Sequence, residues 1–408
     1  MRTLLIPLAS KLRNEDLTKR VLDTIKSSLS NLYKYEADIV DDKEALRGLE
    51  FDVGISIVLT GGTEELIIGL AKIGKSVIYV AHDKLNSLPA LLEAAPLIKD
   101  LNNVVIASVS DPRPDVEAFV RACKALLTLK GFRVGLIGGI SPWIVYSKAD
   151  PGFIKKRLGI EIVNIDLKEV IDLYEQMSVP KELRNKVVKR ALNVIVTSDE
   201  VTNALKIYLA LKTIVRNYKL NAISVRCFDL IESLRTTACL ALSLLNNEGV
   251  TAACEGDVMA TLAMILGQLI SGKPTFMANP AWVKNNKMLL AHCTIPTAIC
   301  DTYDLLTHFE SGIGVGVRGI PTYSKYVTLL RLSNDLKRMR VVLGRPVIPT
   351  RFSDEHCRTQ IIIECKDSLE RVVKDSIGNH YVMMLGNHVR SLDILGKLLG
   401  IKDIEIIK

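Results

Sequence analysis

Apolar and polar residues alternate at two different periods along the first 130 residues of the chain. Short apolar runs are separated by longer stretches in which apolar residues recur at helical spacing, as in residues 14–32 and 63–73. The apolar runs are residues 4–10, 51–59, 76–82 and 103–110. Strands that alternate with amphipathic helices form a largely parallel sheet covered by helices on both faces. The pattern therefore predicts a doubly wound α/β domain over residues 1–130.

The alternation restarts after a long helical stretch and then changes in character. Residues 114–129 are typical of one long helix, and further strands are expected at residues 133–140, 161–166, 221–227 and 250–256. These strands predict a second doubly wound α/β domain over residues 131–273. From residue 274 onward, short strands follow one another with Gly and Pro between them and little helix. The predicted fold is α/β, with two parallel-sheet domains followed by a β-rich, barrel-like domain over residues 274–408.

Composition indicates an ordinary soluble protein. The hydrophobic fraction is 48% and the charged fraction 24%, and no apolar run reaches the eighteen or more residues that a membrane span needs. Met1 leads directly into a strand-like segment with no secretory signal pattern, so we expect a cytoplasmic protein with no membrane partner. The eight cysteines form no C-x-x-C pair, which favours reduced thiols. Few glutamines beside abundant Ile, Val, Lys and Glu indicate a thermophilic source.

The positive charge of the chain is concentrated in one region. The net charge is +8, and the densest basic patch lies between Arg318 and Arg351. Its strand-like residues lack the aromatic platforms that single-stranded nucleic acids require, so we expect no nucleic-acid partner. Two interpretations stay open, a solvated protein face or a site for a phosphorylated or sulfonated substrate.

Residues 69–76 match the phosphate-loop pattern G-x-x-x-x-G-K-S in the wrong structural context. A true phosphate loop follows a strand and opens a helix, so that the backbone N–H groups of the helix start face the phosphates. Here the glycines close a predicted helix and lead into the strand at residues 76–82. The sequence does not favour nucleotide binding there.

The strongest chemical signal is a carboxylate at the end of a predicted strand. Glu255 ends the apolar segment 250–254 and is followed by a helix at residues 257–271, for which Asp257 is a natural N-cap. Open α/β sheets bind ligands at the carboxyl ends of their strands. A carboxylate in apolar surroundings needs a partner such as a metal ion.

Three further polar groups end or begin other predicted strands. They are Asn279, His292, and His380 with its neighbour Asn379. Each histidine taken alone is more often structural than a ligand. Together with Glu255 they offer a carboxylate, an amide and two imidazoles, a mixture that favours Mn²⁺, Co²⁺ or Mg²⁺ over structural zinc.

Three segments of the chain resemble the active-site segments of the L-fucose isomerase and L-arabinose isomerase superfamily. They are residues 254–279, 292–296 and 378–387, and the resemblance extends over residues 131–408. It implies that Glu255 is the first acid and a manganese ligand, that His380 is the metal-binding histidine, and that His292 corresponds to an additional histidine of the arabinose isomerase branch. It also implies a homo-oligomer, often a trimer or hexamer.

The chain departs from this superfamily at Asn279, where the family has its second acid. An amide oxygen can coordinate a metal ion but cannot accept a proton. Either Glu255 acts with another acid, such as Glu310 or Asp257, or the chemistry differs.

The resemblance implies a metal-dependent aldose–ketose isomerase that acts on a small-molecule carbohydrate through an enediol. We predict Glu255 and Asn279 as catalytic residues and Glu255, Asn279 and His380 as metal ligands. The predicted substrate-binding residues are His292, Asn379, Arg358 and Glu310. The alternative is a noncatalytic sugar-binding protein that has lost the second acid.

Overall fold

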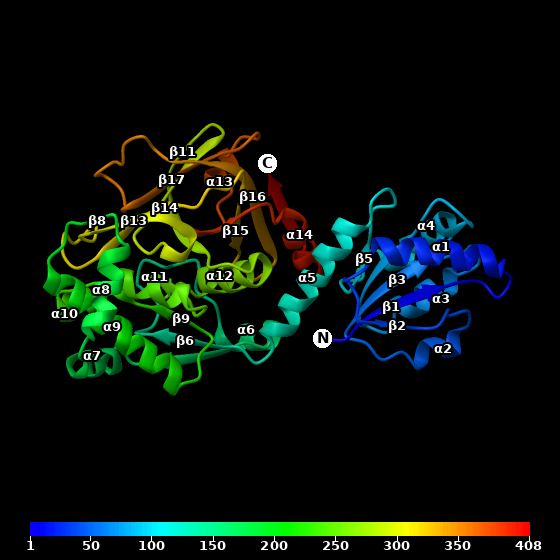
Figure 1. Cartoon of the computed structure of the whole chain (residues 1–408), viewed down its shortest axis with the longest axis horizontal. Coiled ribbons are helices and arrows are strands. Elements are labelled where there is room, and N and C mark those ends of the chain that lie inside the picture. The colour runs from blue at the N-terminus through cyan, green and yellow to red at the C-terminus, as the bar shows by residue number, and fades with distance from the viewer. The chain divides into compact units, whose positions relative to one another are not determined.

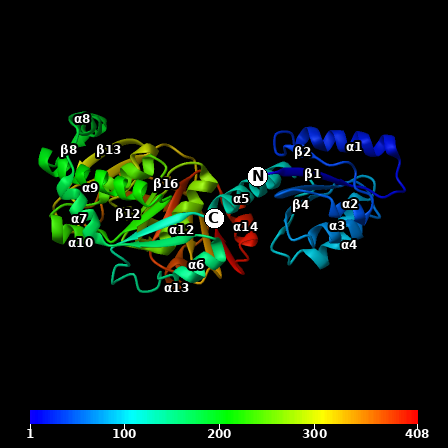
Figure 2. The ribbon, with the colours of Figure 1, turned by 90° about the horizontal axis from the view of Figure 1, so that it is seen from below.

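The computed structural model describes residues 1–408, which divide into two compact units. The first unit contains Met1–Leu127 and Arg390–Lys402, and the second contains Thr128–Val389 and Asp403–Lys408 (Figures 1 and 2). Near its C-terminus the chain therefore returns to the first unit with helix α14 (Val389–Leu398). The division of the rest into two domains at residue 273 stays a prediction.

The first unit contains the expected parallel sheet with helices around it. Its strands are ordered β2-β1-β3-β4-β5, and all neighbours are parallel. The strands are β1 (Thr3–Leu8), β2 (Tyr35–Glu36), β3 (Val53–Val58), β4 (Ser76–Val80) and β5 (Val104–Ile106). The helices between and after them are α1 (Glu15–Ser28), α2 (Lys43–Arg47), α3 (Glu64–Ala71), α4 (Ser87–Ile98) and α5 (Arg113–Leu129). This order is one of the two common doubly wound arrangements.

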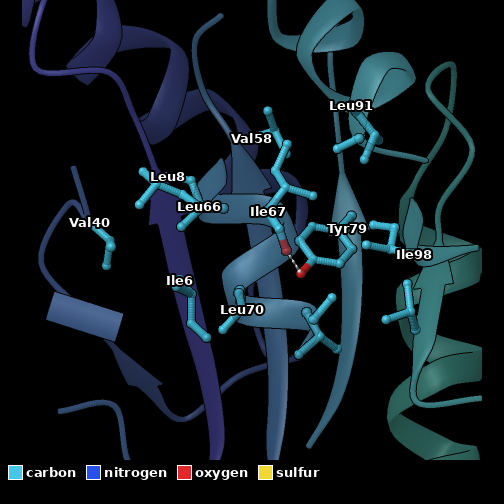
Figure 3. Close-up of a cluster of buried hydrophobic side chains, with 14 of the residues drawn as sticks. Ile6, Leu8, Val40, Val58, Leu66, Ile67, Leu70, Tyr79, Leu91 and Ile98 are labelled. Carbon is cyan, nitrogen blue, oxygen red and sulfur yellow. Dashed lines mark hydrogen bonds between the residues drawn. The ribbon is translucent and has the colours of Figure 1, made fainter. Parts of the chain in front are cut away.

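The core of the first unit lies between this sheet and its helices. Strand residues such as Ile6 and Val58 pack with Ile67 of α3, and all three are fully buried (Figure 3). Tyr79 is also fully buried, and its hydroxyl donates to the carbonyl oxygen of Ile67 at 2.7 Å. Such continuous apolar strands are typical of parallel sheets covered on both faces.

The phosphate-loop pattern at residues 69–76 lies between a helix and the following strand, as the sequence predicts. Helix α3 ends at Ala71 and strand β4 begins at Ser76, so the pattern spans a helix end rather than a helix start. The loop therefore offers no helix N-terminus to a phosphate group. None of the helices of the chain is both long and apolar enough to cross a membrane.

The second unit begins with another parallel sheet, ordered β10-β9-β6-β7. The strands are β6 (Arg133–Ile137), β7 (Glu161–Ile165), β9 (Ala222–Val225) and β10 (Thr251–Cys254). The helices are α6 (Pro151–Leu158), α7 (Leu167–Gln176), α8 (Lys181–Arg190), α9 (Ser198–Asn217), α10 (Cys227–Leu234), α11 (Cys239–Asn247) and α12 (Val258–Ser271). The second doubly wound sheet expected from the sequence is confirmed. Helix α12 is buried along nearly its whole length, which explains why its sequence is apolar on all sides.

The β-rich part of the second unit is a closed barrel. Six strands pair in the order β15-β18-β11-β12-β17-β16, and β16 pairs back with β15. Their bounds are β11 (Phe276–Lys284), β12 (Lys287–His292), β15 (Val327–Leu332), β16 (Arg338–Val347), β17 (Thr359–Glu364) and β18 (Tyr381–Leu385). Strand β19 (Asp403–Ile407) adds to β16 in parallel. The barrel-like expectation is therefore confirmed, and closure leaves none of the six barrel strands as a sheet edge.

A small third sheet and two short helices complete this unit. The sheet is ordered β14-β13-β8, from β8 (Asn193–Val194), β13 (Cys300–Leu306) and β14 (Gly316–Pro321). The short helices are the 3₁₀ turn η1 (Thr297–Ile299) and α13 (Glu370–Lys374). The loop between β13 and β14 carries His308 and Glu310, which matter for the site described next.

Candidate functional site

Glu255 lies in a strained turn between the end of β10 and the start of α12. Its φ is 64°, a left-handed conformation that non-glycine residues rarely adopt, and Gly256 follows with φ 65°. A Cβ atom on Gly256 would lie 2.2 Å from the carbonyl oxygen of Gly139, so only glycine fits this close backbone approach. The backbone N–H of Ser141 donates to the Glu255 carbonyl oxygen at 3.1 Å. The turn therefore holds a buried carboxylate in one fixed direction.

Asp257 caps helix α12 and also supports a histidine. Its Oδ1 accepts a hydrogen bond from the Ala260 N–H at 2.8 Å, which confirms the predicted N-cap role. Its Oδ2 lies 2.9 Å from Nδ1 of His380. A carboxylate on one nitrogen of a histidine fixes the ring and leaves the other nitrogen free for a ligand.

A buried arginine of the barrel contacts both Asp257 and the segment that carries His380. Arg331 of β15 is fully buried, and its Nη1 lies 3.7 Å from Oδ2 of Asp257. The guanidinium also donates to the carbonyl oxygens of Ile377 and His380, at 3.0 and 3.1 Å, and to the hydroxyl of Ser147. Arg331 thereby joins Asp257, the segment before β18 and the loop after β6. Although Arg331 belongs to the basic patch of the sequence, its charge is paired inside the protein and is not free to bind a ligand.

Glu255, His292 and His380 form a group that could hold a metal ion. One ligand atom from each of the three lies within 4.8 Å of the others. Oε1 of Glu255 is 3.4 Å from Nε2 of His380 and 3.8 Å from Nε2 of His292. These distances are long for hydrogen bonds and suit donors that converge on a common centre. The sequence assigned His292 to the substrate, but its ring lies with the candidate metal ligands.

The charges within this group stabilise each other. Burial alone would raise the pKa of Glu255, but the two histidines lower it well below its ordinary range. Burial acts to lower the pKa of His380, yet the Asp257 and Glu255 carboxylates raise it to about 9. The site is therefore built around an anionic carboxylate that attracts positive charge.

Two buried polar atoms at this site have no hydrogen-bond partner. They are Nε2 of His380 and Oδ1 of Asn279. Asn279 does not end a strand as the sequence predicts but lies within β11, where it pairs with Ala291, the residue before His292, and Ala278 pairs with Tyr381, the residue after His380. A buried polar atom without a partner costs roughly 1–3 kcal/mol, so such atoms indicate a missing ligand. A divalent ion that accepts mixed nitrogen and oxygen donors fits both of them.

An aromatic residue that the sequence analysis missed contacts Glu255 directly. Trp143, in the loop between β6 and α6, donates from Nε1 to Oε2 of Glu255 at 2.6 Å. Its ring packs edge to face on Phe228, with centroids 4.9 Å apart, and Phe228 packs in the same way on His308 at 5.8 Å. The indole is 48% exposed, so one side of it faces solvent beside the carboxylate. Trp143 therefore directs one oxygen of Glu255 and leaves the other to the histidines.

We expect Trp143→Phe to weaken binding of Co²⁺ about tenfold, because the carboxylate loses the donor that orients it. Calorimetry on metal-stripped protein measures this change. Trp282, the other tryptophan, provides the matched control. Equal Co²⁺ affinity in the Trp143→Phe and Trp282→Phe variants would contradict an orienting role.

The loop between β13 and β14 adds a second carboxyl group. Burial raises the pKa of Glu310, and the nearby Glu255 carboxylate raises it further. In the same loop, burial, His292 and Arg358 together lower the pKa of His308 to about 4, so His308 is neutral at pH 7. Glu310 is therefore close enough to Glu255 for that carboxylate to increase its proton affinity, which is the property that proton transfer needs.

The other predicted substrate residues lie around this loop and the start of β18. Nε of Arg358 donates to the carbonyl oxygen of Thr307 at 2.8 Å, which brings this cation to the loop of His308 and Glu310. Asn379 is exposed immediately before the buried His380. Substrate binding by these residues, and by Glu310 and His292, stays a prediction.

Known proteins that resemble this chain share one name. The sulfoquinovose isomerase of Clostridium sp. (strain MSTE9) is 24% identical over 351 residues, which are 78% of this chain and 75% of that protein. Sulfoquinovose isomerases of Priestia megaterium and Alkalicoccus urumqiensis are each 22% identical, over 69% and 70% of this chain and 66% and 67% of their own lengths. No protein-family model matches the chain. The chain is thus similar over most of its length to proteins named as sugar isomerases.

Proposed function

We propose that this protein is a metal-dependent aldose–ketose isomerase. The observation that carries the proposal is the convergence of Glu255, His292 and His380, with the unpaired Oδ1 of Asn279 on the strand that pairs next to His292. The similarity to sulfoquinovose isomerases supports an enzyme that acts on a small-molecule carbohydrate. The narrower placement in the L-fucose and L-arabinose isomerase superfamily belongs to the same proposal.

Glu255, His292, His380 and Asn279 would hold the metal ion. We assign Mn²⁺, with Co²⁺ or Mg²⁺ as substitutes, because two imidazoles and two oxygen donors suit these ions. Such an ion supplies Lewis acidity, which polarises a sugar carbonyl and acidifies the neighbouring C–H bond. Asp257 keeps the His380 ring oriented, and Trp143 keeps Glu255 oriented.

Glu310 is the group best placed to move the proton. Isomerisation transfers a proton between C1 and C2 through an enediol, and this transfer needs a base near the acidified C–H bond. Asn279 cannot serve as that base. Asp257 is fully buried, and its two oxygens already accept from Ala260 and contact His380. Glu310 is an accessible residue of the loop between β13 and β14, and partial burial of its carboxyl group and the charge of Glu255 raise its pKa.

The apolar side chains beside the site favour an assembly of several copies. Besides Trp143, the same loop exposes Val145 to 72% and Tyr146 to 42%. Clustered exposed apolar side chains often mark interaction surfaces. A homo-oligomer, trimeric or hexameric as the family resemblance implies, would cover them next to the sugar.

A sugar panel with and without metal tests the proposed function. Metal-stripped protein is assayed with Mn²⁺ against aldoses and ketoses that include sulfoquinovose, L-fucose, L-arabinose and their ketose partners. We expect Mn²⁺-dependent interconversion of at least one pair, with exchange of the C2 hydrogen for solvent deuterium, as proton transfer through an enediol requires. Sugar binding without interconversion or exchange, under every metal, would instead identify the noncatalytic sugar-binding protein.

A further inference from the structure

The basic patch of the sequence divides into two groups of cations. Most of its members are held by carboxylates: Arg318 by Asp304, Arg338 by Asp375 and Asp403, and Arg340 by Glu405. Lys325 forms no ion pair, and its ammonium group lies 5.6 Å from the centroid of the Tyr326 ring. Arg345 reaches Glu364 at only 3.6 Å. Lys325 is therefore free to pair with a ligand, and the exposed Arg345 is held by a single carboxylate that it shares with Lys287.

Lys325 and Arg345 line a cavity of about 500 Å³ in the second unit. The cavity is also lined by Lys366 and Lys408, which form no ion pair. The remaining lining residues are Asn286, Tyr326, Leu343, Gly344, Glu364, Cys365 and Asn387. Four cationic side chains thus face the Glu364 carboxylate and the α-carboxylate of Lys408, and Glu364 is already shared by Arg345 and by Lys287 at 3.1 Å. The cavity has the size of a small-molecule site and an excess of positive charge.

This cavity lies at the other end of the barrel strands from the candidate metal ligands. Strand β12 begins beside Asn286 and ends at His292, and β18 begins after His380 and ends before Asn387. In the strand register, Glu364 of β17 is the partner of Lys287 of β12 and of Arg345 of β16. All three strands therefore reach the cavity at this point. The length of β12 separates the two places by roughly 20 Å at about 3.3 Å per residue. One monosaccharide cannot reach both.

We propose that this cavity is a second ligand site, for a small phosphorylated molecule that carries at least two negative charges. Phosphate oxygens would pair with the ammonium groups of Lys325, Lys366 and Lys408 and with the guanidinium of Arg345, which offers parallel donors. The amides of Asn286 and Asn387 and the ring of Tyr326 provide contacts for uncharged parts of the ligand. The site is independent of the proposed isomerase chemistry.

Calorimetry with inorganic pyrophosphate on metal-stripped protein at constant ionic strength tests the site, with glucose 6-phosphate in a parallel arm. We expect the Lys325→Ala/Lys366→Ala double variant to bind at least ~10-fold more weakly than wild type, because two charge-assisted contacts are lost. The matched control is Lys155→Ala/Lys156→Ala, which removes two exposed lysines of α6. Whichever probe binds more tightly shows whether the site selects a free inorganic anion or a sugar phosphate.

Further variants distinguish a loss of binding at this cavity from an effect of the metal centre and from misfolding. Lys325→Arg/Lys366→Arg keeps the charges, so its affinity for the probes should stay close to wild type. Glu255→Gln should also bind the probes normally, since the cavity lies far from Glu255. No binding of either probe by wild type, equal weakening in the control pair, or loss of binding in Glu255→Gln would each overturn the proposal.

Discussion

Glu255→Gln is expected to lower the affinity for Mn²⁺ and Co²⁺ by roughly 100-fold or more, and to abolish isomerisation with it. The substitution keeps the shape of the side chain and its contact with Trp143, but it removes the negative charge at the centre of the ligand group. The two histidines then have only neutral neighbours with which to hold a divalent ion, apart from Asp257 behind His380. Calorimetry on metal-stripped protein measures the loss.

The control for this variant is Glu232→Gln, which neutralises an exposed carboxylate on α10 of the same unit. Its metal affinity should match that of wild type. Thermal melting of both variants without metal shows whether the fold is kept. Unchanged Co²⁺ affinity in Glu255→Gln would refute the metal centre, and the isomerase proposal would fall with it.

Glu310→Gln is expected to separate metal binding from turnover. The amide keeps the size of the side chain but can no longer accept a proton, so kcat should fall about 100- to 10,000-fold. Metal affinity should change little, because Glu310 does not belong to the group that could hold the ion. Steady-state kinetics and calorimetry on the same preparation test both halves of this expectation.

Asn279→Asp is the informative partner of that experiment. It restores an acid at the position where the resembling superfamily has one, on a residue that pairs with β12 and follows Ala278, which pairs with β18. Partial recovery of turnover in the Glu310→Gln/Asn279→Asp variant would show that the two positions can exchange the role of base. A Glu310→Gln variant with wild-type kcat would instead mean that proton transfer uses another group.

Much of the fold could be predicted because the spacing of apolar residues along the chain reflects which faces of each strand and helix are buried. The strands of both parallel sheets are short apolar runs, since each is covered on two faces, and their separation by amphipathic helices leaves few alternative topologies. Closure of the barrel through the pairing of β15 with β16 could not be derived in the same way. Pairing partners depend on side-chain contacts between distant segments, and strand periodicity carries no information about them.

Only part of the site could be predicted from the sequence, because some of its residues lie in irregular loops or make contacts across long stretches of chain. Glu255, His292 and His380 stand next to strand ends, where polar residues in apolar segments are conspicuous, whereas Asn279 lies within β11 and not at the strand end that the sequence predicts. Trp143 lies in an irregular loop, and its hydrogen bond spans 112 positions of the chain. Arg331 looked like one more member of a basic patch, although it is fully buried behind Asp257. The glycine pair at residues 138 and 139 takes positive φ angles and so marks a sharp turn in this loop, while the close backbone approach is made by Gly256 to the carbonyl of Gly139.

The return of residues 390–402 to the first unit has a consequence for synthesis of the chain. Helix α14 is amphipathic and buries Leu392, Ile394 and Leu395, so the surface that it covers stays open until almost the whole chain has been made. At ordinary translation rates that interval lasts on the order of tens of seconds. During that time the nascent first unit lacks the helix that packs on it, so its folding is completed only after nearly all of the second unit has been synthesised.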